Sequence, residues 1–149
     1  MKKIDLTSLP PENLIELQKN LKSELEHFNA SLQALSTASQ KFKECINNIQ
    51  QLSNVGFADK GILVPLSPSL YIPGKVKDGQ RFMVDIGTGY YIEKNAEQSV
   101  EFYNKRISKL KENSEQLNKT IQEKYDLLNK VQQVLNIRVQ ELQQQQLHL

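Results

Sequence analysis

Two long stretches with an apolar residue at every seventh position constrain this chain more than any other feature. In the first stretch, three of the repeating residues have a second apolar residue four positions later. The repeat consists of Leu14, Leu21, Phe28, Leu35, Phe42 and Ile49, with Leu25, Leu32 and Ile46 as the companions. Such a heptad pattern is typical of a helix that buries a narrow apolar seam against another helix.

The second stretch repeats this pattern near the other end of the sequence. Its first register holds Val100, Ile107, Ile121, Leu128, Leu135, Leu142 and Leu149, and its companion register holds Tyr103, Leu110, Leu117 and Val131. Ser114 is the polar member of the first register. Because neither stretch has an internal glycine or proline, each is expected to form one uninterrupted helix.

The expected ends of these helices carry suitable residues. Pro10 and Pro11 fit a first helical turn, and Asn54 and Gly56 favour termination of the first helix. Asn95, with Gln98 three residues later, fits the N-terminal cap of the second helix. The sequence therefore predicts helices over about 10–54 and 96–149.

The middle segment, 57–95, has a different character. It contains five of the six glycines and three of the five prolines, together with short β-type runs. These runs predict strands at 62–66, 70–72, 82–86 and 90–92, arranged as two hairpins. Pro65 lacks an N–H donor, so its strand should lie at an edge or carry an irregularity.

Together these segments predict a mainly α fold. Each helix can bury its seam only against another helix, so the two should form a long antiparallel coiled-coil hairpin. The two β-hairpins would lie at its connecting end. The chain of 149 residues is expected to form a single domain, 1–149.

The predicted hairpins have no second layer of their own to cover their apolar side chains. We therefore expect them to pair with strands of other chains. The alternative is that they fold onto the ends of their own helices as a small cap. The candidate assembly residues are Ile62, Val64, Leu66, Leu70, Ile72, Phe82, Val84, Ile86, Tyr90 and Ile92.

At the opposite tip, near both termini, polar residues interrupt the seam. Lys124, Arg138 and Gln145 fall on the companion register of the second helix, so helix pairing should loosen there and leave apolar side chains accessible to a client. The alternative is that these side chains simply pack in the coiled coil. The candidate client-binding residues are Leu14, Leu17, Val134, Leu135, Ile137, Leu142 and Leu147.

Charge and composition exclude several classes of function. The net charge of +2 is spread evenly, so nucleic acid is not an expected partner. No apolar run approaches the roughly 18 residues of a membrane span, and no secretory signal is recognisable. The lone Cys45 suits a reducing compartment such as the cytosol.

Nothing in the sequence indicates an enzyme, a cofactor or a metal. His27 and His148 have no cysteine or acidic cluster at a ligand spacing. Cys45 is expected to pack beside Ile46. Gly87-Thr88-Gly89 lacks the Gly-Lys-Ser/Thr signature of a phosphate loop and is better explained as a hairpin turn.

Three strings in the middle segment resemble the α-class prefoldin subunits: Val64-Pro65-Leu66, Pro73-Gly74 and the run from Val84 to Lys94, VDIGTGYYIEK. The resemblance extends over both heptad stretches and the spacing between them. The presence of two hairpins also matches the α class, because β-class subunits carry one.

The resemblance implies a hetero-hexamer with one further α-class and four β-class subunits, joined through the hairpins. The helical tips would capture unfolded cytosolic proteins of the actin and tubulin class and deliver them to the cytosolic chaperonin without ATP. It implies a cytoplasmic location and leaves a nuclear one open. The alternative function is a structural coiled-coil tether or adaptor that binds a folded partner.

Overall fold

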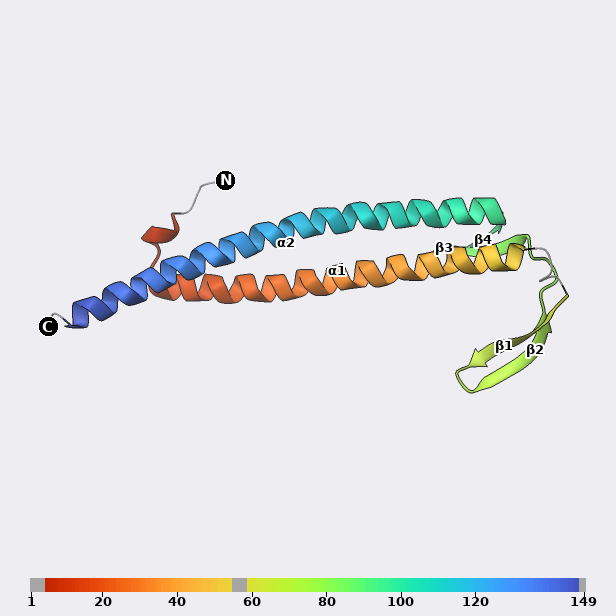
Figure 1. Cartoon of the computed structure of the whole chain (residues 1–149), viewed down its shortest axis with the longest axis horizontal. Coiled ribbons are helices and arrows are strands. Elements are labelled where there is room, and N and C mark those ends of the chain that lie inside the picture. The colour runs from red at the N-terminus through yellow and green to blue at the C-terminus, as the bar shows by residue number, and fades with distance from the viewer. Residues whose placement is uncertain (1–4, 55–58, 148–149) are drawn as a thin grey trace. The chain divides into compact units, whose positions relative to one another are not determined.

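The computed structural model describes residues 5–54 and 59–147, except for the side chain of Leu147. It contains two long helices and four strands (Figure 1). In chain order the elements are the 3-10 helix η1 (Leu6–Ser8), α1 (Pro11–Ser53), β1 (Gly61–Ser67), β2 (Leu70–Lys75), β3 (Arg81–Gly87), β4 (Tyr90–Asn95) and α2 (Ala96–Leu147). The predicted mainly α fold with two β-hairpins is therefore confirmed.

The heptad seams face inward along both helices. In α1 every residue of the main register is buried or half-buried, and in α2 the same holds from Val100 to Leu135. The first helix begins at Pro11, as its proline predicts, and ends at Ser53. Gly56, expected to terminate it, lies outside the described residues.

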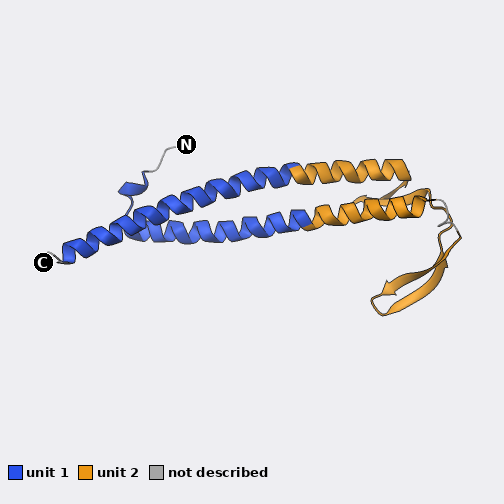
Figure 2. Cartoon of the chain, viewed as in Figure 1, with its two compact units in different colours: residues 1–36, 112–149 blue, residues 37–111 orange. Residues whose placement is uncertain are grey.

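The chain divides into two compact units (Figure 2). Unit 1 comprises residues 1–36 and 112–149, and unit 2 comprises residues 37–111. The helices are antiparallel in unit 1, where Gln18 bonds to Gln132 and Glu24 to Lys124. In unit 2 the ring of Phe42 lies 5.6 Å from that of Tyr103. That the whole chain acts as one domain stays a prediction.

The predicted cap of α2 is present as a reciprocal capping box. The Gln98 backbone N–H donates to Asn95 Oδ1 at 2.8 Å, and the Asn95 N–H donates to Gln98 Oε1 at 3.2 Å. The fully buried Ser99 donates its hydroxyl to the Asn95 carbonyl at 2.7 Å. The last residue of β4 thus also starts α2, which ties the second hairpin directly to the helix.

The four strands form two separate antiparallel pairs, β1 with β2 and β3 with β4. Val64 pairs with Ile72, and Val84 pairs with Ile92. The register shifts between Pro65 and Ser67, which confirms the irregularity that the proline predicts.

The turn between β3 and β4 needs left-handed backbone at three consecutive residues. The φ angles are 110° at Gly87, 51° at Thr88 and 80° at Gly89. Glycine adopts such angles without steric cost, which explains the Gly-Thr-Gly string. The predicted hairpin turn is therefore confirmed.

The loop before β3 lies against the end of α1. A Cβ atom added to Gly79 would stand 2.5 Å from the Leu52 carbonyl oxygen. The Gln80 side-chain amide donates to the Ser53 carbonyl at 3.0 Å, one of the carbonyls that a helix end leaves unsatisfied. These contacts hold the second hairpin at the end of α1.

Candidate functional site

One face of the β3–β4 hairpin packs within unit 2. Val84 is 2% exposed, and Phe82 and Ile86, two residues to either side, are half-buried. Their spacing places all three on the same face of the strand. This hairpin therefore follows in part the alternative of a cap on the chain's own helices. Val84 has almost no side-chain surface left for another chain.

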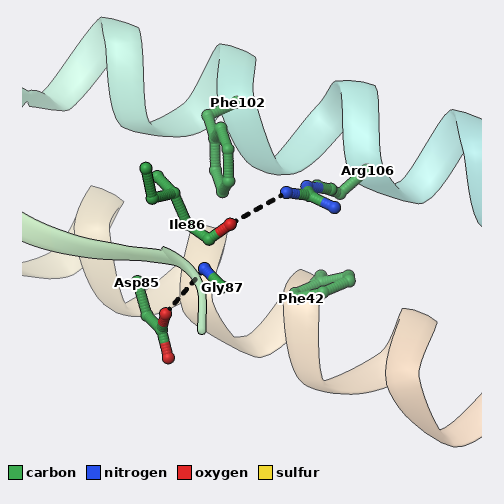
Figure 3. Close-up of a pocket in the computed structure, with 6 residues that line it drawn as sticks. All are labelled: Phe42, Asp85, Ile86, Gly87, Phe102 and Arg106. Atoms are coloured by element: carbon green, nitrogen blue, oxygen red, sulfur yellow. Dashed lines mark hydrogen bonds between the residues drawn. The ribbon is translucent and has the colours of Figure 1, made fainter. Parts of the chain in front are cut away.

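Arg106 on α2 fastens the end of β3. Its guanidinium donates to the Ile86 carbonyl at 3.3 Å and lies 5.2 Å from the centre of the Phe102 ring (Figure 3). A cation above an aromatic face is a favourable electrostatic contact. The carbonyl at the rim of the sheet is thereby satisfied by a helix side chain.

A cavity of about 240 Å³ lies beside this contact. Aromatic and aliphatic side chains of α1, α2 and β3 line it together with Arg106 and Asp85 (Figure 3). The Asp85 carboxylate accepts a hydrogen bond from the Gly87 N–H at 2.8 Å and so bonds within the turn. The cavity thus lies where β3 packs against α1 and α2.

Cys45 and Tyr103 are neighbours in the seam of unit 2. Cys45 is half-buried, in accord with the packing role expected from the sequence. Burial raises the pKa of the Tyr103 hydroxyl, and the nearby Cys45 thiol and Asp85 carboxylate raise it further. The phenol is therefore neutral at physiological pH.

The remaining predicted assembly residues leave much of their surface open. Ile62 and Val64 are half-buried, whereas five others are exposed: Leu66, Leu70, Ile72, Tyr90 and Ile92. That these residues bind other subunits stays a prediction. Their exposure is nevertheless unusual for apolar residues grouped on short strands.

The sequence reasoning missed a second set of exposed apolar residues on the hairpins. These side chains fall between the predicted ones and therefore point to the opposite faces: Leu63, Tyr71, Met83 and Tyr91. Leu63 is 69% exposed and Met83 is 67% exposed. The uninterrupted apolar runs of these strands could have indicated this second set, because such runs are typical of strands that are covered on both faces.

In unit 1 the seam stays closed where loosening was expected. Leu14 and Val131 are fully buried and form a cluster with Leu21 and Leu135. Leu17 and Val134 are half-buried against the same cluster. The expectation that Leu14 and Leu135 offer accessible surface is therefore wrong, because each is enclosed by the opposite helix.

The polar residues on the companion register explain why the seam stays closed. Lys124 forms a 2.7 Å ion pair with Glu24 on the opposite helix, and Arg138 donates a hydrogen bond to the Thr7 carbonyl. Long basic side chains can cover a seam with their methylene groups while their charged ends reach a partner. Lys124 therefore links α2 to α1, and Arg138 links α2 to η1.

Accessible apolar side chains do occur on the last turns of α2. Ile137 and Leu142 are more than half exposed, as is Val139 between them. Leu147 ends α2, but its side chain lies outside the described residues, as does the whole of His148. Sequence reasoning missed the exposed Ile15 on α1, which no heptad position marks. Client binding by any of these residues stays a prediction.

The first described residues form a feature that sequence reasoning did not predict. Residues 6–8 form the 3-10 helix η1, and Asp5 caps it by accepting from the Thr7 N–H at 3.1 Å. Leu6 and Leu9 pack against the apolar cluster of unit 1. The three-residue spacing of Leu6 and Leu9 could have indicated this turn, because residues three apart lie on the same side of a 3-10 helix.

The described residues also bear on metal binding and on membrane insertion. Among residues 5–54 and 59–147, no three His, Cys, Asp or Glu side chains gather closely enough to hold a metal ion. Over the same described ranges, neither helix has a stretch apolar enough to span a membrane.

Comparisons with known proteins agree with this architecture. The family model described as "Prefoldin subunit" matches residues 21–143. The "Probable prefoldin subunit 5" of Schizosaccharomyces pombe is 42% identical over 135 residues, which cover 90% of this chain and 88% of that protein. Human "Prefoldin subunit 5" is 34% identical over 142 residues, covering 93% and 90% of the two chains.

A solved structure supports the fold independently. A chain in the cryo-EM structure of filamentous PFD from Methanocaldococcus jannaschii superposes with a TM-score of 0.71 at 20% identity. The match covers 78% of this chain and 95% of that one. The family match, the relatives and the two-hairpin fold agree with the sequence resemblance: the chain belongs to the prefoldin family of chaperone subunits.

Proposed function

We propose that this chain is one subunit of a hetero-hexameric, ATP-independent co-chaperone and assembles through its two β-hairpins with one further α-class and four β-class subunits. The observation that carries this proposal is the exposed apolar surface on both hairpins, in a chain of the prefoldin family. Exposed strand edges with apolar faces are stable in solution when another chain covers them.

The client would be held at the helical tips. Several tips that each bind one apolar segment weakly hold a client firmly, because after the first contact the others act at high local concentration. Ile137 and Leu142 are exposed on the last turns of α2, where such contacts can form. The proposed clients are unfolded proteins of the actin and tubulin class, which pass to the cytosolic chaperonin in the cytoplasm.

Native mass spectrometry of the complex purified with a tagged copy of this chain tests the assembly. A six-chain particle with four single-hairpin subunits is expected. A monomer, a homodimer or a complex with a folded partner alone would contradict the proposal and favour a structural tether.

Suppression of aggregation tests the chaperone activity. The purified complex, mixed with unfolded actin diluted from denaturant, should reduce light scattering without added ATP. A complex of the correct composition that leaves scattering unchanged would retain the assembly proposal and refute client capture.

A further inference from the structure

Leu6 and Leu9 of the segment from Asp5 to Leu9 pack against the apolar cluster of unit 1. The segment directly precedes α1 and lies beside α2, to which the Thr7–Arg138 hydrogen bond links it (Figure 1). Leu6 and Leu9 are both half-buried against the cluster that contains Leu14 and Val131. In a 3-10 turn, residues three apart lie on the same side. The segment therefore presents its two leucines together to the helices.

Hydrogen bonds within the segment keep its shape, and among the described residues a hydrogen bond from Arg138 attaches it to α2. Asp5 Oδ1 accepts from both the backbone N–H and the hydroxyl of Thr7, and Ser8 Oγ donates to the Asp5 carbonyl at 2.8 Å. Arg138 on α2 donates to the Thr7 carbonyl. A five-residue segment with so small a contact can open locally while the helices stay folded.

The surface under the segment is also part of the proposed client site. Leu17 and Val134 pack against the same cluster as Leu6 and Leu9. One turn farther along α2, Ile137 is 55% exposed. A client segment bound at Ile137 therefore reaches the covered cluster only where Leu6 and Leu9 move away.

We propose that residues 5–9 form a displaceable lid that competes with client for the apolar surface of unit 1. The proposal rests on the proposed client-binding function. Because the lid occupies the surface in the free subunit, only subunits with an open lid can bind client. The apparent affinity for client is therefore the intrinsic affinity multiplied by the fraction of subunits in which the lid is open.

The lid also indicates which client segments fit this surface. It offers two aliphatic side chains three residues apart, with the backbone carbonyl of Thr7 between them as the acceptor for Arg138. An unfolded chain provides a carbonyl at every residue, so the aliphatic pair decides the fit. The matching client chemistry is a short uncharged segment with leucine-like residues at positions i and i+3.

A crosslinking experiment on the assembled complex measures client contact with this subunit alone. A photocrosslinking amino acid replaces Gln140, an exposed polar residue on α2, and unfolded actin is added below saturation. The double substitution Leu6→Ser with Leu9→Ser should raise the crosslink yield about three- to tenfold. The single substitution Arg138→Gln should raise it less, because it removes one hydrogen bond and leaves the leucine contacts.

The control is Ile15→Ser, which removes an exposed apolar side chain outside the lid. It should leave the yield unchanged or lower it. An unchanged or lower yield with the double substitution would overturn the lid proposal, because the segment would then be inert or itself a client contact. If no variant crosslinks and the unsubstituted complex does not suppress aggregation, the proposed function fails and the lid fails with it.

Hydrogen exchange measured on the unsubstituted complex also tests whether client displaces the lid. The backbone N–H groups of Thr7 and Ser8 bond to Asp5 within the docked segment, and an isolated turn of this length is marginal in water. Client binding should therefore speed exchange in the peptide that contains residues 5–9. Slower exchange in that peptide would show that client covers the segment, which overturns the lid.

Discussion

Unit 1 and unit 2 both contain apolar seam residues, but they differ in how far their other apolar side chains are covered. In unit 1 the leucines near the start of α1 are enclosed by α2, and Leu6 and Leu9 add a further layer. In unit 2 the strands carry apolar side chains on both faces, and only one face of β3 is covered. The two helices cover each other's seam, whereas the two-stranded sheets leave apolar side chains exposed to solvent.

The largest effect is expected from a substitution that disrupts assembly and leaves the fold of the subunit intact. Leu70→Asp places a charge on an exposed apolar strand position. Burying that charge in a subunit interface should weaken assembly by at least about 3 kcal/mol, or more than a hundredfold. Size-exclusion chromatography with light scattering should show a free subunit, while circular dichroism shows unchanged helix content.

The matched control is Ser69→Asp, one residue earlier in the exposed turn between β1 and β2. It adds the same charge outside the strand and should leave the complex assembled. Full assembly of the Leu70→Asp variant would show that this hairpin surface is not a subunit interface.

A pair of adjacent residues tests the closed seam of unit 1. Leu14 is fully buried, whereas its neighbour Ile15 is 57% exposed. Leu14→Ala should lower the free energy of unfolding by about 3 kcal/mol because it leaves a cavity between the helices, and Ile15→Ala should change it by less than about 0.5 kcal/mol. Urea unfolding followed by circular dichroism measures both. Equal effects would indicate that the seam is open at Leu14.

Two glycines test how firmly the second hairpin is held at the end of α1. A Cβ at Gly79 would stand 2.5 Å from the Leu52 carbonyl oxygen, while a Cβ at Gly61 would meet no atom within 4 Å. Gly79→Ala should therefore cost about 1–3 kcal/mol, because the loop must move away from the helix. Thermal unfolding should show no comparable loss for Gly61→Ala. A Gly79→Ala variant as stable as the parent would argue against the close approach.

The smallest expected effect is a pH dependence of η1. Hydrogen bonds from the Thr7 hydroxyl and N–H lower the pKa of Asp5 below its usual value of 3.8. The carboxylate therefore supports the turn above pH 3.8, and this support is lost as the pH falls through the lowered pKa. The protection of the Thr7 and Ser8 amides, measured as their exchange rate relative to an unstructured peptide at the same pH, should fall in that range. The variant Asp5→Asn should show no such pH step, and a parent profile without a step would contradict the capping role.

Local sequence patterns were sufficient to predict most of the fold. The seven-residue period and the absence of internal glycine and proline predicted both helices, because those rules depend on neighbouring residues alone. Asn95 with Gln98 predicted the cap, and Gly87-Thr88-Gly89 predicted the turn. The same local strings carried the family resemblance, which the relatives named subunit 5 confirm for this chain.

The candidate sites were harder to predict, because accessibility depends on contacts between distant residues. Leu14 and Ile137 look equally apolar in the sequence, yet one is enclosed by the opposite helix and the other is exposed. Periodicity identified one face of each hairpin and overlooked Leu63 and Met83 on the other. Such differences require knowing which surface lies opposite each side chain.

Spacing along the chain was enough to predict the helices, their seams, the two hairpins and the family. It could not predict that the seam closes around Leu14, that Leu6 and Leu9 lie on it, or that Gly79 meets the end of α1, all of which emerge from the folded chain. Burial is a property of two surfaces in contact, and residues far apart in the chain supply the second surface.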